Sequence, residues 1–150
     1  MTGVSAEEMI GQGDYAYTIP FYGKSRPFLM DLLLMDNKEL ATKYQKIERI
    51  GNNIMVEVFC KTLYGNMGAW VFVKAAPLQD QHGNIIGAIE ILRDISAQKL
   101  AETYREVGKE VLLLLNKPGD LKEIVQLVVT LLKKRTGFDA AGIRLQEGCS

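Results

Sequence analysis

Few residues of this chain could do chemistry, and their spacing excludes most catalytic arrangements. The single histidine, His82, lies in the stretch "DQHGN" (Asp80 to Asn84), which is typical of an exposed turn. With one histidine, no convincing Ser-His-Asp arrangement and no phosphoryl-accepting helix histidine can be assembled. No Gly-x-x-x-x-Gly-Lys loop is present to hold a nucleotide phosphate. We therefore expect no enzymatic activity from this chain.

The two cysteines, Cys60 and Cys149, lie in a strand-like stretch and at the last-but-one position. Neither their number nor their spacing predicts a disulfide framework or a metal site. Cys60 is expected to fill space on its strand, as buried cysteines commonly do. A reducing, cytoplasmic setting is the default expectation.

An aromatic-rich stretch, "GQGDYAYTIPFYGKSRP", contains the candidate binding residues. An apolar pocket with one cation suits a small organic acid. Such clusters more often form ordinary core, and both interpretations stay open. The candidate pocket residues are Tyr15, Tyr17, Phe21, Tyr22, Arg26 and Phe28, expected to face Phe59 and Trp70 across a sheet.

Composition places the chain among globular proteins with one domain, or a small domain and a piece of another. It is 47% hydrophobic and 24% charged, with a formal net charge of zero. Without a basic excess, neither nucleic acid nor an anionic membrane surface is expected as a partner. The longest apolar runs fall short of the ~20 residues that span a bilayer, and no secretory signal is visible.

Hydrophobic periodicity predicts helices first and strands afterwards. Ser5 and Glu8 suit a capping box for a short helix, and a two-residue alternation begins near Ile54. Two short turns then connect three strands into an antiparallel meander. The expected elements are helical segments at Ser5–Ile10, Phe28–Leu34 and Asn37–Gln45, and strands near Ile54–Lys61, Ala69–Leu78 and Ile85–Leu92.

A long helix follows the third strand with no loop between them. Asp94 is placed to cap it, since an acid at a helix start accepts free amides. The apolar residues form a narrow heptad stripe, which is typical of a helix that pairs with a copy of itself. Packing on the chain's own core is the alternative. The expected dimer seam is Ala97, Leu100, Tyr104, Val107, Val111 and Leu114.

After "NKPGD" a second helix is expected over Leu121–Arg135, capped by Asp120 and closed by Gly137. "DAAGIRLQEG", from Asp139, predicts the beginning of a strand.

Three motifs together resemble the PAS family of sensory domains, over residues 1–102. "TGVSAEEMIG" resembles the helical middle of a PAS domain, and "WVFVKAAPLQDQHGNIIGAIEILRDIS" resembles its last two strands. Asp94-Ile95-Ser96 matches the Asp-Ile-Thr signature by which PAS domains pass into a signalling helix, with Ser96 in place of threonine. Gly119 to Glu147 resembles, more weakly, the opening helix and first strand of a GAF domain.

The resemblance implies an α+β fold: a PAS-like antiparallel sheet with helices on one face, a long signalling helix and a short α/β tail. The implied domains are residues 1–96 (PAS-like, lacking the N-terminal strands), 97–118 (signalling helix) and 119–150 (truncated GAF-like start). In the family, the absent first strand lies beside the last one, so Ile85 to Leu92 is expected to form an open edge.

The resemblance also implies a sensory and signal-relay role in a cytoplasmic two-component protein such as a sensor histidine kinase. Asp94, Ile95 and Ser96 are the implied coupling residues, and downstream GAF or kinase domains are the implied partners. A ligand-free dimerisation module is the alternative. A haem sensor of this family needs an axial ligand on a central helix, and residues 1–50 hold no histidine; the Asn-Cys-Arg-Phe run of flavin photosensors is also absent. The cofactor, if any, is unknown.

Overall fold

The structure is a computed structural model that describes residues 1–34 and 47–144. The chain divides into two compact units, Met1–Ser96 and Ala97–Ser150. Helices and an antiparallel sheet together make an α+β protein, as the sequence predicts. The expected helix at Asn37–Gln45 and the cysteine Cys149 lie outside the described residues.

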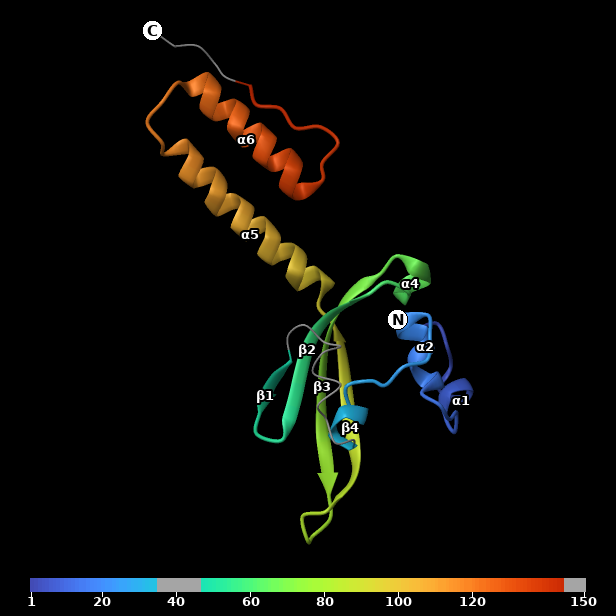
Figure 1. Ribbon diagram of the computed structural model, residues 1–150. Helices are drawn as coiled ribbons and strands as arrows, with labels where there is room; N and C mark the ends of the chain where they lie inside the picture. The colour runs from blue at the N-terminus through green and yellow to red at the C-terminus, as the bar shows by residue number, and fades with distance from the viewer. Residues whose placement is uncertain (35–46, 145–150) are drawn as a thin grey trace. The chain divides into compact units, whose positions relative to one another are not determined.

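The first unit is built on a four-stranded sheet in the order β1-β2-β3-β4, with every neighbouring pair antiparallel (Figure 1). The strands are β1 (Glu48–Ile50), β2 (Asn53–Cys60), β3 (Ala69–Gln79) and β4 (Ile85–Asp94). The predicted three-strand meander is confirmed as β2, β3 and β4. The fourth strand, β1, was not predicted, because three exposed residues give no alternation to read.

Alternation along β2 and β3 assigns one face of the sheet to the core. Val56 pairs with Val73 and Val58 with Val71, and the remaining inward positions follow the same period of two. Phe28, Leu29 and Leu32, from the segment before the sheet, complete this core. The buried cluster on β2 and β3 and their connection is Ile54, Val56, Cys60, Leu63, Ala69, Val71, Val73 and Ala75.

Short helical segments precede the sheet, and the stretch from residue 17 to residue 33 supplies side chains to its core. In chain order they are α1 (Ala6–Met9), the 3-10 helix η1 (Ala16–Thr18), α2 (Ile19–Tyr22) and α3 (Asp31–Leu34). The cap on α1 is confirmed, since Ser5 accepts a hydrogen bond from the Glu8 amide at 3.3 Å. The helical region predicted for Phe28–Leu34 is thus confined to its second half. A further turn, α4 (Leu63–Asn66), joins β2 to β3.

The second unit contains two antiparallel helices, α5 (Ser96–Leu115, beginning on the last residue of the first unit) and α6 (Leu121–Thr136) (Figure 1). Val107 on α5 and Val128 on α6 are each nearly fully buried. Arg135 of α6 also forms an ion pair with Glu110 of α5. The two helices therefore pack on each other as a hairpin.

The ends of α6 match the sequence pattern. Asp120 Oδ1 accepts hydrogen bonds from the amides of Lys122 (2.7 Å) and Glu123 (3.3 Å). Gly137 ends the helix with φ of 69°, a left-handed conformation that glycine adopts without strain. The strand predicted from Asp139 is wrong for the part that the structure describes, because residues 139–144 pair with no strand.

Across the described ranges, no helix combines the length and the hydrophobicity that crossing a bilayer requires.

Candidate functional site

The aromatic residues of the predicted pocket gather around Phe28. The centre of its ring lies 5.4 Å from the ring centre of Phe21 and 5.5 Å from that of Tyr22, and both pairs of rings are tilted. The Arg26 guanidinium carbon lies 3.9 Å from the centre of the Tyr22 ring, which is cation–π geometry. Phe28 is fully buried within the main core. The structure thus brings these four residues together, as part of the packed core layer.

Phe59 and Trp70 do not face this cluster, contrary to the expectation from sequence. They pair with each other across β2 and β3, with ring centres 5.7 Å apart. Their neighbours Cys60 and Ala69 point into the core, so Phe59 and Trp70 project from the opposite face. Their exposed fractions, 44% and 39%, agree with this placement. The two rings form part of the outer surface of the sheet.

Tyr15 and Tyr17 occupy different environments from the aromatic cluster. Tyr15 precedes η1 in a left-handed conformation, with φ of 59°. Tyr17 packs against the core and donates its hydroxyl hydrogen bond to Asp31 Oδ2. Burial first, and then the Asp31 carboxylate, raise the pKa of the Tyr17 hydroxyl well above its usual value. Tyr17 therefore remains a neutral hydrogen-bond donor to Asp31.

Thr18 is the buried polar side chain of this region, and its hydroxyl is satisfied. It donates to the carbonyl of Tyr15 at 2.8 Å and accepts from the amide of Arg26 at 3.1 Å. These bonds close the loop that carries the aromatic residues. Sequence reasoning missed Thr18, since nothing in its neighbourhood distinguishes it from a surface threonine.

The predicted coupling residues form a compact hydrogen-bonded junction at the end of β4. Asp94 Oδ1 accepts the Ser96 amide at 2.8 Å, so the aspartate satisfies the first amide of α5. Ser96 Oγ accepts the Trp70 amide at 3.0 Å, and Ile95 donates its amide to the Trp70 carbonyl at 2.9 Å. Ile95 itself is buried. The predicted cap is therefore present, placed one residue earlier than the usual capping position.

Tyr64 completes the junction and was not anticipated from the sequence. It donates its hydroxyl to Asp94 Oδ2 at 2.9 Å across 30 residues of chain. Its backbone takes a left-handed conformation, with φ of 54°, within the turn α4. The Ser96 amide, then the Ser96 and Tyr64 hydroxyls, lower the pKa of the Asp94 carboxyl. Only a tyrosine followed by Gly-Asn, "YGN", marked this position as a special turn.

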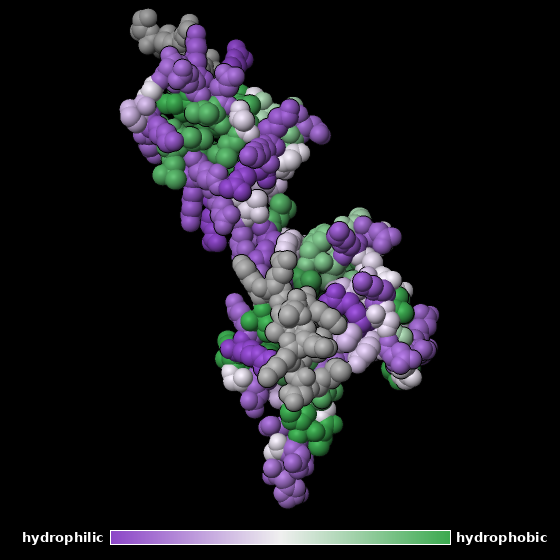
Figure 2. Space-filling view, in the orientation of Figure 1, coloured by the Kyte–Doolittle hydropathy of each residue, from purple (hydrophilic) through white to green (hydrophobic). Residues whose placement is uncertain are grey.

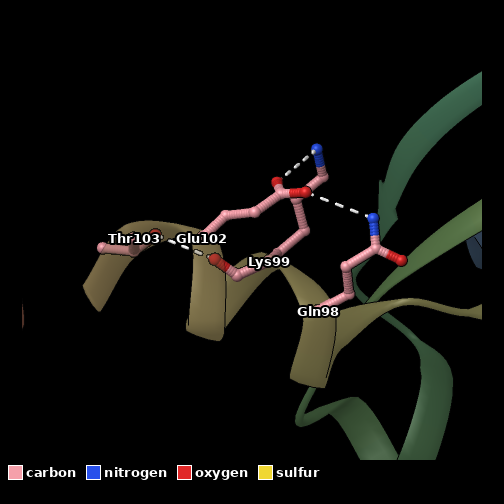
Figure 3. A network of polar contacts seen from close by, with 4 residues as sticks. All are labelled: Gln98, Lys99, Glu102 and Thr103. Carbon is pink, nitrogen blue, oxygen red and sulfur yellow. Dashed lines mark hydrogen bonds and ion pairs between the residues drawn. The ribbon is translucent and has the colours of Figure 1, made fainter. Parts of the chain in front are cut away.

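Beyond the junction, the first turns of α5 carry a polar network (Figure 3). Gln98 donates to Glu102 at 3.2 Å, Lys99 lies 3.5 Å from the same carboxylate, and Thr103 donates to the Lys99 carbonyl at 3.0 Å. Contacts spaced three and four residues apart support the helix where it begins.

The predicted dimer seam of α5 divides into two parts. Val107 is buried, and Val111 and Leu114 are half-buried. Leu100 and Tyr104 are 53% and 44% exposed, and Ala97 is also exposed. The N-terminal part of the stripe therefore stays on the surface of the unit. Figure 2 shows further apolar surface over this hairpin.

The remaining reactive candidates are spread apart. Cys60 is a buried free thiol on β2. His82 is exposed, and its backbone amide donates to Asp80 Oδ1 at 2.8 Å within the turn between β3 and β4. Within the described ranges, no three His, Cys, Asp or Glu side chains group as metal ligands.

In comparisons with known proteins, the chain matches no protein-family model and no curated protein sequence.

Proposed function

We propose that this chain is a non-catalytic sensory and signal-relay module, PAS-like in its first unit, of the kind found in sensor histidine kinases. The sheet and its aromatic layer would respond to a ligand or partner, and α5 would act as the signalling helix that pairs with its copy. The residues that follow α5 would begin a GAF-like domain. The motifs Asp94-Ile95-Ser96 and Gly87-Ala88-Ile89-Glu90 support this proposal.

The observation that carries the proposal is the hydrogen-bonded junction. The Trp70 carbonyl on β3 accepts a hydrogen bond from the Ile95 amide, and the Trp70 amide donates one to Ser96 Oγ. Asp94 on β4 accepts a hydrogen bond from the Ser96 amide, the first amide of α5. One residue, Ile95, separates the last residue of β4 from the first of α5. A displacement of β3 or β4 would therefore act directly on the first turn of α5, because no loop lies between them.

Hydrogen exchange on the 150-residue chain tests this relay. Val71→Ala perturbs the core beside the junction, because Val71 pairs with Asp94. Val56→Ala is the matched control on β2, the same chemical change at another buried core position. We expect faster exchange in the first turns of α5 for Val71→Ala than for Val56→Ala, after correction for global stability. In an Asp94→Ala background this difference should disappear.

Equal exchange in α5 for the two valine variants would show that the junction transmits nothing, and the relay proposal would be rejected. Persistence of the difference in the Asp94→Ala background would instead assign the coupling to the Trp70 backbone bonds alone. Exchange within α6 serves as an internal reference, because α6 makes none of the junction bonds described above.

A ligand-free dimerisation or interaction module is the second candidate. The exposed apolar side chains of the outer sheet face, Phe59, Trp70, Ile89 and Ile91, favour it. Native mass spectrometry of the purified chain separates the two candidates. A bound small molecule favours sensing, whereas repeated dimers free of any ligand favour simple assembly.

A further inference from the structure

Glu90 lies on β4, at a position that faces the core side of the sheet. It pairs with Ala75, which is fully buried, and its neighbour Leu92 packs against the same core. Strand alternation therefore directs Glu90 toward the layer formed by residues 28–34. The side chain is partly buried in a largely apolar environment. A carboxyl group in such a place needs either a partner or a proton.

The partners of Glu90 come from the segment that begins α3. Glu90 Oε2 accepts the Met30 amide at 2.7 Å, which joins β4 to that segment. One residue further on, Asp31 Oδ2 accepts the Phe28 amide at 2.7 Å and the Tyr17 hydroxyl. Two carboxyl groups thus hold the segment together, one from the sheet and one from the segment itself.

Asp31 is the charged side chain that raises the pKa of Glu90, and its charge has the same sign as that of an ionised Glu90. Asp31 and Tyr17 are the titratable groups that act on Glu90 or share its cluster. The nearest basic residues of the strands, Lys74 and Arg93, alternate with core positions and so lie on the opposite face. An ionised Glu90 would therefore be repelled by the like charge of Asp31.

Burial is the larger cause that disfavours ionised Glu90, and Asp31 adds a like charge. Together they raise the pKa of the Glu90 carboxyl to about 8, although the Met30 amide opposes them. Near neutral pH the Glu90 carboxyl accordingly holds a proton.

We propose that Glu90 and Asp31 form a proton-operated latch. With a proton on Glu90, the Phe28–Leu34 segment stays closed on β4; loss of that proton puts two negative charges together and loosens the segment. This inference concerns the attachment of α3 to the sheet and does not depend on the relay proposed above.

The raised pKa of Glu90 decides whether stability rises or falls with pH. In the unfolded chain a glutamate releases its proton near pH 4.3, whereas the folded protein keeps it up to about pH 8. Between these limits the folded state binds the extra proton, so stability falls as pH rises, by up to about tenfold per pH unit in the unfolding equilibrium. Above the pKa that Glu90 has in the folded protein, its protonation no longer makes stability depend on pH.

Glu90→Gln tests the latch, because the amide keeps the shape and an acceptor oxygen for Met30 but cannot ionise. Urea unfolding from pH 5 to 9 should show a smaller loss of stability for Glu90→Gln than for the parent chain. Glu48→Gln on the exposed strand β1 is the matched control and should follow the parent chain. Parallel curves for the parent and Glu90→Gln would overturn the proposal.

A local measurement on the parent chain does not depend on how the variant folds. With ¹³C-labelled glutamate, the Glu90 carboxyl resonance should titrate near pH 8, and the Met30 amide resonance should move with the same midpoint. At pH 9 the Met30 amide should exchange faster in the parent than in Glu90→Gln. A Glu90 midpoint near pH 4 to 5, the ordinary glutamate range, would rule the latch out.

Discussion

Burial controls the protonation of the cysteine on β2. Cys60 lies in the main core, and burial raises the pKa of its thiol to about 11, against the opposing charge of Arg26. The thiolate is the nucleophilic form, so at neutral pH Cys60 combines poor access with an unreactive protonation state.

Cys60 should therefore resist alkylation in the folded chain. With iodoacetamide at pH 8, we expect slow labelling under native conditions and fast labelling in guanidinium chloride. Site-resolved mass spectrometry separates Cys60 from Cys149. Equal native and denatured rates at Cys60 would contradict its placement in the core.

Asp94 should stabilise the fold in its ionised form. Since the Ser96 amide, and then the Ser96 and Tyr64 hydroxyls, lower the pKa of its carboxyl, this stability is present above the ordinary aspartate value of about 3.9. It is lost as pH falls through the lower folded-state value. Asp94→Asn should be less stable than the parent at pH 7 in urea unfolding, and the two should converge in acid.

Tyr64→Phe removes one of the three hydrogen bonds that lower the pKa of the Asp94 carboxyl. It should therefore lose stability at pH 7, but less than Asp94→Asn does. If Asp94→Asn and the parent differ by the same amount at every pH, the difference arises from packing and not from the charge of the aspartate.

At the scale of elements, the sequence predicted where strands and helices lie better than which way they face. Apolar residues occupy both alternating sets of β2: Ile54, Val56 and Val58 on one, Met55 and Phe59 on the other. Periodicity gives the alternation but cannot say which set is inside when both are apolar. Because of this ambiguity, Phe59 and Trp70 were predicted to face the aromatic cluster, whereas they lie on the outer face of the sheet. Contacts across long stretches of chain, such as Tyr64 to Asp94 and Met30 to Glu90, leave no local signal at all.

The turn between β2 and β3 offers a test of the outer face. Gly68 has φ of 79°, and a Cβ added there would lie 2.5 Å from the Phe59 ring. Gly68→Ala should cost about 1–2 kcal/mol for the left-handed backbone, plus about 0.5–1.5 kcal/mol for displacing the Phe59 ring from Trp70. Chemical unfolding measures the sum.

Gly83→Ala is the matched control, since Gly83 has φ of 84° but open space around its Cβ position. It should show the backbone cost alone. An equal loss for both variants would mean that the Phe59–Trp70 contact contributes nothing to stability.

At the scale of the whole molecule, self-association through α5 stays a prediction. The hairpin with α6 already buries Val107, so a charge there would damage the second unit itself. Leu100 and Tyr104 are the exposed members of the stripe, and they are the better positions to test.

Leu100→Glu with Tyr104→Glu should convert a dimer to a monomer in sedimentation experiments, because a seam would have to bury unpaired charges. Leu113→Glu, at another exposed α5 position outside the predicted seam, is the control and should leave the dimer intact. An unchanged oligomer in the double variant would exclude this seam.

Trp70 is the single tryptophan of the chain, and both its backbone groups bond to the junction. Its indole is also partly open to solvent on the outer sheet face. The protein therefore carries its own optical probe where β3 meets the start of α5. Emission wavelength and quenching by iodide would report any rearrangement there in unlabelled protein, and a screen of small molecules could follow that fluorescence directly.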